Sequence, residues 1–194
     1  MKDDAIRSGI RRRLLLAGVS APIVIASGRI AGRQALAATP ACDDGPTPRQ
    51  TAGPFFTPDS PQRSSLLETG VRGPRLTVTG TVLTTDCKPV AGALLDFWQC
   101  DANGDYDNRG YRLRGHQFAD AQGRYRLETI VPAPYPGRTR HIHVRVQPRG
   151  GRILTTQLYF SGERLNDRDF LYRPELLMQL AGVEGRFDFV LDTA

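Results

Sequence analysis

The stretch LTVTGTVLT, Leu76 to Thr84, decides the fold class. Apolar residues alternate with threonine along it, and side chains two positions apart lie on the same face of a β-strand. The stretch therefore predicts a strand with one buried face. The turn sequence CKPVAG interrupts the pattern at residues 87–92, and ALLDFWQC resumes it at residues 93–100. We expect two strands joined by a hairpin.

The same kind of segment recurs toward the end of the chain. Two short strands are predicted around the Gln122-Gly123 turn, and three more follow in HIHVRVQ (141–147), ILTTQLYF (153–160) and RFDFVLD (186–192). Short strands with a turn about every 8–12 residues are typical of an all-β protein, an antiparallel β-sandwich with long loops. The spacing of ELLMQLA predicts one or two short helical turns around residues 174–181.

The first 38 residues have the pattern of an export signal. Arg11-Arg12-Arg13 precedes the apolar run LLLAGVSAPIVIA, and a small-residue cleavage site follows at Ala35-Leu36-Ala37. The double arginine before Leu-Leu predicts the twin-arginine route, so we expect a periplasmic or extracellular protein. The apolar run is too short to cross a bilayer, and we expect no membrane span in the mature form. Residues 39–75 should be a lead-in packed on the body, and residues 76–194 the catalytic sandwich.

The positive charge is concentrated in this leader. The whole sequence has a formal net charge of +6, and residues 1–38 hold seven of the 26 Lys and Arg residues but only two of the 20 Asp and Glu residues. The rest of the chain is therefore close to neutral. Since nucleic-acid binding usually requires a basic patch, the composition argues against a nucleic-acid partner.

Three cysteines, Cys42, Cys87 and Cys100, remain after the leader. Export would place them in an oxidising compartment, where one disulfide and one leftover thiol are expected. Cys87 and Cys100 flank the predicted hairpin, so we expect them to pair first. A bond from Cys42 to either of them is the alternative.

The segment PYPGRTRHIHVRV, Pro134 to Val146, is the strongest candidate for a functional site. On a strand, the side chains of His141 and His143 project from the same face, which suits two ligands of one metal ion. Tyr135 lies just before them, on a loop that two prolines make rigid and extended. We therefore expect a metal site here.

Two different metal sites can be built around this histidine pair. With His116 as a third histidine, the site would suit Zn²⁺ with an open position for water. With Tyr135 and with Tyr106, which ends the turn DANGDY, it would suit a harder ion, because phenolate favours Fe³⁺. Spacing alone leaves both sites open, with the tyrosine site slightly ahead because Tyr135 shares the rigid segment of the two histidines.

Four motifs between Thr51 and Phe160 resemble the intradiol ring-cleavage dioxygenases, the family of catechol 1,2-dioxygenase and protocatechuate 3,4-dioxygenase. They are TAGPFF, PVAGALLDFWQCDANGDY, TIVPAPYPGRTRHIH and TTQLYF. The resemblance is greatest to short, secreted, single-domain members. It implies a prealbumin-like β-sandwich that cleaves a small aromatic diol with O₂, between the two hydroxyl-bearing carbons, to a cis,cis-muconate-type diacid.

The resemblance also assigns roles to individual residues. It implies a mononuclear Fe³⁺ cofactor bound by four ligands: Tyr106, Tyr135, His141 and His143. Tyr135 would leave the metal when the substrate binds. Arg138 would stabilise negative charge that develops on the ring, and Gln157 would support the site from outside the ligand set. Thr139-Arg140 replaces a family Pro-Ala or Thr-Pro before the first histidine, which would add a cation beside the site and leaves the substrate preference open.

Two other functions stay open. The segments PVAGALLDFWQ and DAQGRYRLETIVPAPY also resemble non-catalytic prealbumin-like and carboxypeptidase-regulatory-like sandwiches, which bind or stiffen. A zinc-dependent hydrolase or lyase would use the three histidines. Among catechols, substituted catechols, hydroxyquinol and lignin-derived diphenols, the sequence ranks none, and it leaves the oligomeric state open, with a homodimer as one candidate.

Overall fold

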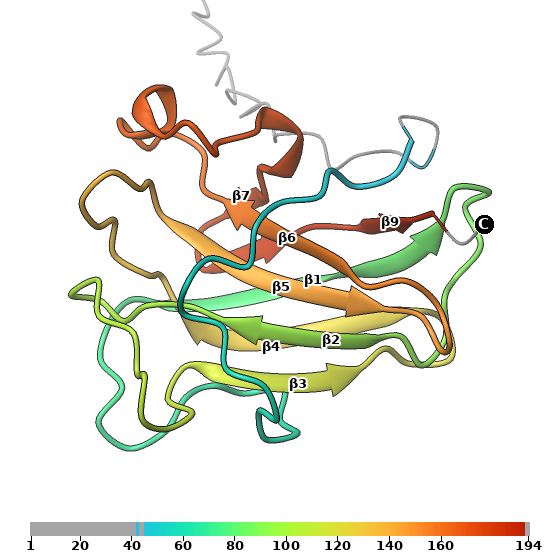
Figure 1. Cartoon of the computed structure of the whole chain (residues 1–194), viewed down its shortest axis with the longest axis horizontal. Coiled ribbons are helices and arrows are strands. Elements are labelled where there is room, and N and C mark those ends of the chain that lie inside the picture. Colours follow the sequence, from blue (N-terminus) through green and yellow to red (C-terminus); the bar gives the residue numbers. More distant parts are fainter. Residues whose placement is uncertain (1–41, 43–44, 193–194) are drawn as a thin grey trace, which may run out of the picture. The chain divides into compact units, whose positions relative to one another are not determined.

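Two β-sheets packed face to face make up the part of the chain described by the structure, a computed structural model of residue 42 and residues 45–192 (Figure 1). The strands are β1 (Arg75–Thr84), β2 (Leu94–Trp98), β3 (Arg114–Phe118), β4 (Arg124–Ile130), β5 (His141–Gln147), β6 (Leu154–Tyr159), β7 (Gln179–Ala181), β8 (Glu184–Arg186) and β9 (Phe189–Leu191). The predicted export signal lies outside these residues. The all-β sandwich is confirmed, whereas the domain boundaries at residues 38 and 75 stay predictions.

One sheet has the strand order β4-β1-β8-β7, with β9 also paired to β1, and the other has the order β3-β2-β5-β6. The second sheet is antiparallel throughout, as predicted. In the first sheet, however, β8 and β9 run parallel to β1, which the sequence did not predict. The two pairings share one register along β1 and are separated only at Phe187 and Asp188, and a Cβ at Gly80 would lie only 1.7 Å from the carbonyl oxygen of Phe187. Glycine is therefore required where the Phe187 carbonyl approaches β1.

Alternation along β5 sorts its side chains between the core and the outer face of its sheet. Ile142, Val144 and Val146 are fully buried in the hydrophobic core between the sheets. His141 and His143 therefore project from the opposite face of the same strand. Their low exposure, 1% each, comes from the loops that cover that face rather than from the core.

The one or two helical turns predicted around residues 174–181 are confirmed only at the start of that range. Two short 3₁₀ turns are present, η2 (Asn166–Arg168) and η3 (Pro174–Leu176), but the chain is extended after Leu176. Met178 donates its backbone N–H to the Tyr159 carbonyl, and β7 then begins at Gln179. Leu176 and Met178 both point into the core, so the apolar residues follow a strand period. No helix within residue 42 and residues 45–192 is long and apolar enough to cross a membrane.

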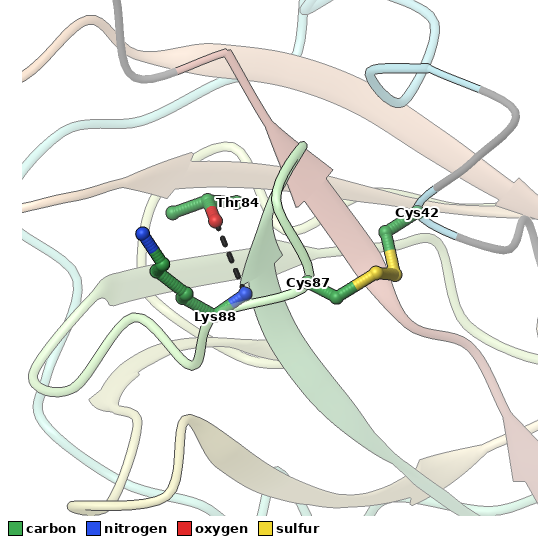
Figure 2. Close-up of a disulfide and its surroundings, with 4 residues drawn as sticks. All are labelled: Cys42, Thr84, Cys87 and Lys88. Carbon is green, nitrogen blue, oxygen red and sulfur yellow. Dashed lines mark hydrogen bonds between the residues drawn. A yellow bond between two sulfur atoms is a disulfide. The ribbon is translucent and has the colours of Figure 1, made fainter.

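The disulfide joins Cys42 to Cys87, so the first pairing that we predicted, Cys87 with Cys100, is wrong and the alternative holds (Figure 2). Cys87 lies at the turn after β1, where the backbone N–H of Lys88 donates to the Thr84 hydroxyl. Cys100 follows β2 at the other end of that strand. It is buried, and its thiol donates to the Ala133 carbonyl at 3.3 Å. The length of β2 separates the two cysteines that we expected to pair.

Candidate metal centre

The candidate metal centre consists of Tyr106, Tyr135, His141 and His143, which converge where β2 ends and β5 begins. Their polar atoms surround one point. The Nε2 atom of His141 lies 3.2 Å from Nε2 of His143, 3.5 Å from the Tyr106 hydroxyl and 3.4 Å from the Tyr135 hydroxyl. The structure thus brings together all four ligands that the sequence predicted, although their binding of a metal stays a prediction.

Two turns aim the tyrosines at this point. In the first, one carboxylate oxygen of Asp101 accepts backbone hydrogen bonds from Asn103 at 2.8 Å and from Asp105 at 3.1 Å, which closes the loop just before Tyr106. The ring of Phe55 stacks on the Tyr106 ring, with centroids 4.4 Å apart and planes inclined by 17°. The lead-in therefore contacts the site directly.

The second turn is the proline loop. Tyr135 and Arg138 exchange backbone hydrogen bonds of 3.3 and 2.9 Å, and Gly137 between them has a positive φ of 80°. Only glycine adopts this conformation without strain. The resulting tight turn presents Tyr135 and Arg138 together, immediately before β5.

The imidazoles are arranged as metal ligands. Nδ1 of His141 lies 2.7 Å from the carbonyl oxygen of Thr139, which can only accept, so this nitrogen carries the proton and Nε2 has the free lone pair. Burial lowers the pKa of His141 to about 4 and holds that of His143 well below its usual value. Both rings are therefore neutral at pH 7, and their lone pairs are available to a cation.

The tyrosines complete a set of donors that suits a hard, highly charged cation. Burial raises the pKa of Tyr106, and that of Tyr135 is raised as well, so neither would ionise at neutral pH without a nearby cation. Two partly buried phenols and two neutral imidazoles facing one point gain most from a cation that makes the phenols phenolates. The residues present therefore fit a trivalent metal ion.

Arg138 and Gln157 contact each other beside this centre. The Arg138 guanidinium donates to the Gln157 side-chain oxygen at 2.5 Å and, through Nε, to the Asp169 carboxylate at 2.9 Å. Gln157 donates its amide to the Thr51 carbonyl at 3.1 Å. The hydroxyl of Tyr159 lies 3.1 Å from the Gln157 oxygen. The guanidinium is thus fixed on two sides.

Sequence reasoning missed Asp169 and Tyr159. Tyr159 is two residues after Gln157 on β6, so the strand period alone would have placed both side chains on one face. No comparable signal existed for Asp169. It comes from the segment after β6, and only the tertiary fold brings it to Arg138, 31 positions earlier.

Two predicted neighbours do not join the centre. His116 contacts the Ser60 hydroxyl at 3.2 Å and the ring of Phe118 instead. Within the described residues, no group of three His, Cys, Asp or Glu side chains is placed to hold a metal, so the three-histidine zinc site is wrong. Arg140 pairs with Glu163 at 2.8 Å and donates to the Pro132 carbonyl, so its charge is balanced outside the centre rather than added to it.

Several known proteins are similar to this chain. A family model described as Dioxygenase matches residues 51–193. The chlorocatechol 1,2-dioxygenase of Pseudomonas sp. (strain P51) is 31% identical over 73% of this chain and 69% of the relative. The catechol 1,2-dioxygenase of Candida albicans is 31% identical over 62% of this chain and 49% of the relative, so the chain spans about half the length of that enzyme.

Among solved structures, the dioxygenase domain of a dioxygenase–carbohydrate-binding protein fusion from Streptomyces sp. SirexAA-E is similar to this chain. It shares 56% identity and a TM-score of 0.74, and the match covers 77% of this chain and 99% of that domain. The similarity therefore extends over the whole of that domain.

Proposed function

The chain belongs to the intradiol ring-cleavage dioxygenase family, and on this premise we propose that it opens catechol-type aromatic rings with O₂. The ring bond between the two hydroxyl-bearing carbons would break, and each of these carbons would become a carboxyl group. Both oxygen atoms of O₂ enter the product, so no separate reductant is needed. The observation that carries the proposal is the convergence of Tyr106, Tyr135, His141 and His143 beside Arg138.

We propose Fe³⁺ as the cofactor, held by Tyr106, Tyr135, His141 and His143. When bound, it would supply Lewis acidity that favours the ionised form of the diol and orients the ring. The choice of Fe³⁺ over Zn²⁺ is supported by the two phenols in the donor set and by the absence of His116 from it.

The surrounding residues would handle protons and charge. Tyr135 lies on the tight turn before β5. Its phenolate would accept a proton from a bound diol and so become a neutral phenol. Arg138 would put fixed positive charge next to the ring where negative charge develops. Its contacts with Asp169 and Gln157 hold it in place before the substrate arrives, so little reorganisation is needed during the reaction.

The substrate class is a small aromatic diol. Because Arg140 is paired with Glu163, we propose that it does not select for a carboxylate on the ring. This favours catechol, substituted catechols and hydroxyquinol over acidic diphenols. Comparing kcat/KM for catechol and protocatechuate in Arg140→Ala tests the point, and a change in their ratio would contradict it.

We also propose that the protein is exported. The leader pattern and the Cys42–Cys87 disulfide support this, since disulfides persist mainly in oxidising compartments. Replacing Arg11, Arg12 and Arg13 together by lysine should leave the protein in the cytoplasm if the twin-arginine route is used. Cell fractionation reports the result, and unchanged export of that variant would contradict the route.

A visible spectrum with metal analysis of the purified protein tests the function. We expect a phenolate-to-Fe³⁺ charge-transfer band at a stoichiometry near one iron per chain, shifted to longer wavelength by catechol under anaerobic conditions. Addition of O₂ should then yield the diacid. A protein that stays colourless after Fe³⁺ is added would contradict the proposal and favour a binding module of the same fold.

A further inference from the structure

Trp98 and His143 are a directly opposed pair on neighbouring antiparallel strands. Trp98 ends β2, and the register of β2 with β5 places it opposite His143 on the same face of the sheet. Opposed side chains on one face of an antiparallel pair are close enough to interact. The two rings are stacked, with centroids 4.8 Å apart and planes inclined by only 5°. Each residue is 1% exposed.

His143 lacks the hydrogen bond that fixes its neighbour. A metal-binding histidine usually donates its second ring nitrogen to a carbonyl, a carboxylate or water, which sets the ring orientation. His141 has such a bond, to Thr139. Nδ1 of His143 is buried and has no hydrogen-bond partner within residue 42 and residues 45–192. The contact that the structure shows for this imidazole is the Trp98 ring stacked on it.

Trp98 is itself held from a second side. The Phe56 ring meets the indole edge to face, with centroids 4.9 Å apart, and the Arg145 guanidinium lies 3.5 Å from the centroid of the Phe56 ring. The indole Nε1 is also buried without a hydrogen-bond partner among the described residues. A buried N–H without a partner is unfavourable, whereas the indole ring contacts both Phe56 and His143.

We propose that Trp98 is a positioning residue for His143. Ring stacking sets the orientation of the His143 imidazole, as the hydrogen bond to Thr139 sets that of His141. The inference rests on the metal binding proposed above. It makes the metal affinity depend on a residue that is outside the ligand set. A flat aromatic ring is needed at position 98, whereas an apolar side chain of similar bulk is not sufficient.

Four variants separate orientation from packing. Trp98→Phe keeps a ring, whereas Trp98→Leu and Trp98→Met keep apolar bulk without one. Phe97→Leu is the matched control, because Phe97 is the preceding residue of β2, is fully buried and faces the core rather than the centre. The affinity for Fe³⁺ is measured by competition with a chelator on each full-length protein, together with its thermal unfolding.

We expect Leu and Met at position 98 to weaken Fe³⁺ binding by about 10-fold to 100-fold, the range seen when outer-shell partners of metal ligands are lost. Trp98→Phe should bind nearly as tightly as the wild type, and Phe97→Leu should lose stability without losing affinity. If Trp98→Leu does not fold, Trp98→Met decides the question. Wild-type affinity in the folded ringless variants would overturn the inference.

A second measurement needs no variant, because Trp98 is the only tryptophan in the chain. Its fluorescence should change with the same midpoint as Fe³⁺ binding, and emission that stays constant up to saturation would overturn the stacking contact in the loaded protein. If the wild type binds no Fe³⁺ at all, the proposed function fails first. If it binds but the ringless variants bind equally well, only the role of Trp98 fails.

Discussion

Arg138 and Asp169 form a buried ion pair, with 2.9 Å between Nε and the carboxylate oxygen, directly beside the candidate metal centre. The Asp169 side chain is 1% exposed, and the same carboxylate oxygen also accepts the backbone N–H of Thr139 at 2.9 Å. Its other oxygen accepts the backbone N–H of Leu171. One carboxylate thus connects the segment after β6 to the loop that carries Arg138.

We expect Asp169→Asn to lower kcat much more than it raises KM, because Arg138 would lose the partner that fixes it. Breaking a buried ion pair by removing one partner typically costs about 3–5 kcal/mol of stability. Urea unfolding and steady-state kinetics measure the two effects. Asp167→Asn is the matched control, since Asp167 is exposed in η2 of the same segment. Equal behaviour of the two variants would show that Asp169 does not position Arg138.

Replacing the individual tyrosines near the centre should have different effects on the visible spectrum of the iron-loaded protein. Tyr135→Phe and Tyr106→Phe should each alter or remove the charge-transfer band of the iron-loaded protein. Tyr159→Phe should leave the band unchanged, because the Tyr159 hydroxyl lies near Gln50, Gln157 and Leu171 instead of the ligand nitrogens. A band that depends on Tyr159 but not on Tyr135 would mean that the ligands are wrongly assigned.

His116→Ala distinguishes the two metal sites that spacing left open. Because His116 contacts Ser60 and Phe118 outside the centre, we expect this variant to keep its iron content and its ring-cleaving activity. His141→Ala is the comparison and should lose both. Metal analysis of the purified variants checks the result. Loss of metal from His116→Ala would support the three-histidine site instead.

Much of the fold follows from local patterns. Alternation along Leu76–Thr84 and His141–Gln147 identifies β1 and β5 and puts both histidines on the face opposite the core. The parallel pairing of β8 and β9 with β1 does not follow, because alternation indicates that a strand exists but not which neighbour it pairs with. Gly80 marks the close approach of the Phe187 carbonyl to β1, but a glycine within a strand has several explanations.

The residues of the candidate centre also fall into those that the sequence predicts and those that only the structure brings together. Tyr135, His141 and His143 lie within one short segment, so their proximity could be predicted from the sequence and the family resemblance. Asp169 is brought to Arg138 by the segment that follows β6, and the Trp98–His143 stack depends on the register of β2 with β5. The local sequence determines neither. The disulfide also had to come from the structure, since three cysteines allow several pairings.

The Cys42–Cys87 disulfide should stabilise the fold without taking part in catalysis. It closes a loop of 45 residues, and a loop of that size lowers the entropy of the unfolded chain enough to contribute about 4 kcal/mol. Cys42→Ser should therefore lower the free energy of unfolding by about that amount, with kcat nearly unchanged, because the bond lies at the hairpin turn after β1 and away from the candidate metal centre.

Cys100→Ser is the matched control for this prediction, because its thiol is free and buried. That variant should keep the disulfide, which peptide mapping of the oxidised protein reports directly, and reducing agent should then destabilise it as much as the wild type. Reducing agent should have no further effect on the stability of Cys42→Ser. A cross-linked peptide containing Cys100, or a Cys42→Ser protein as stable as the wild type, would contradict the assignment.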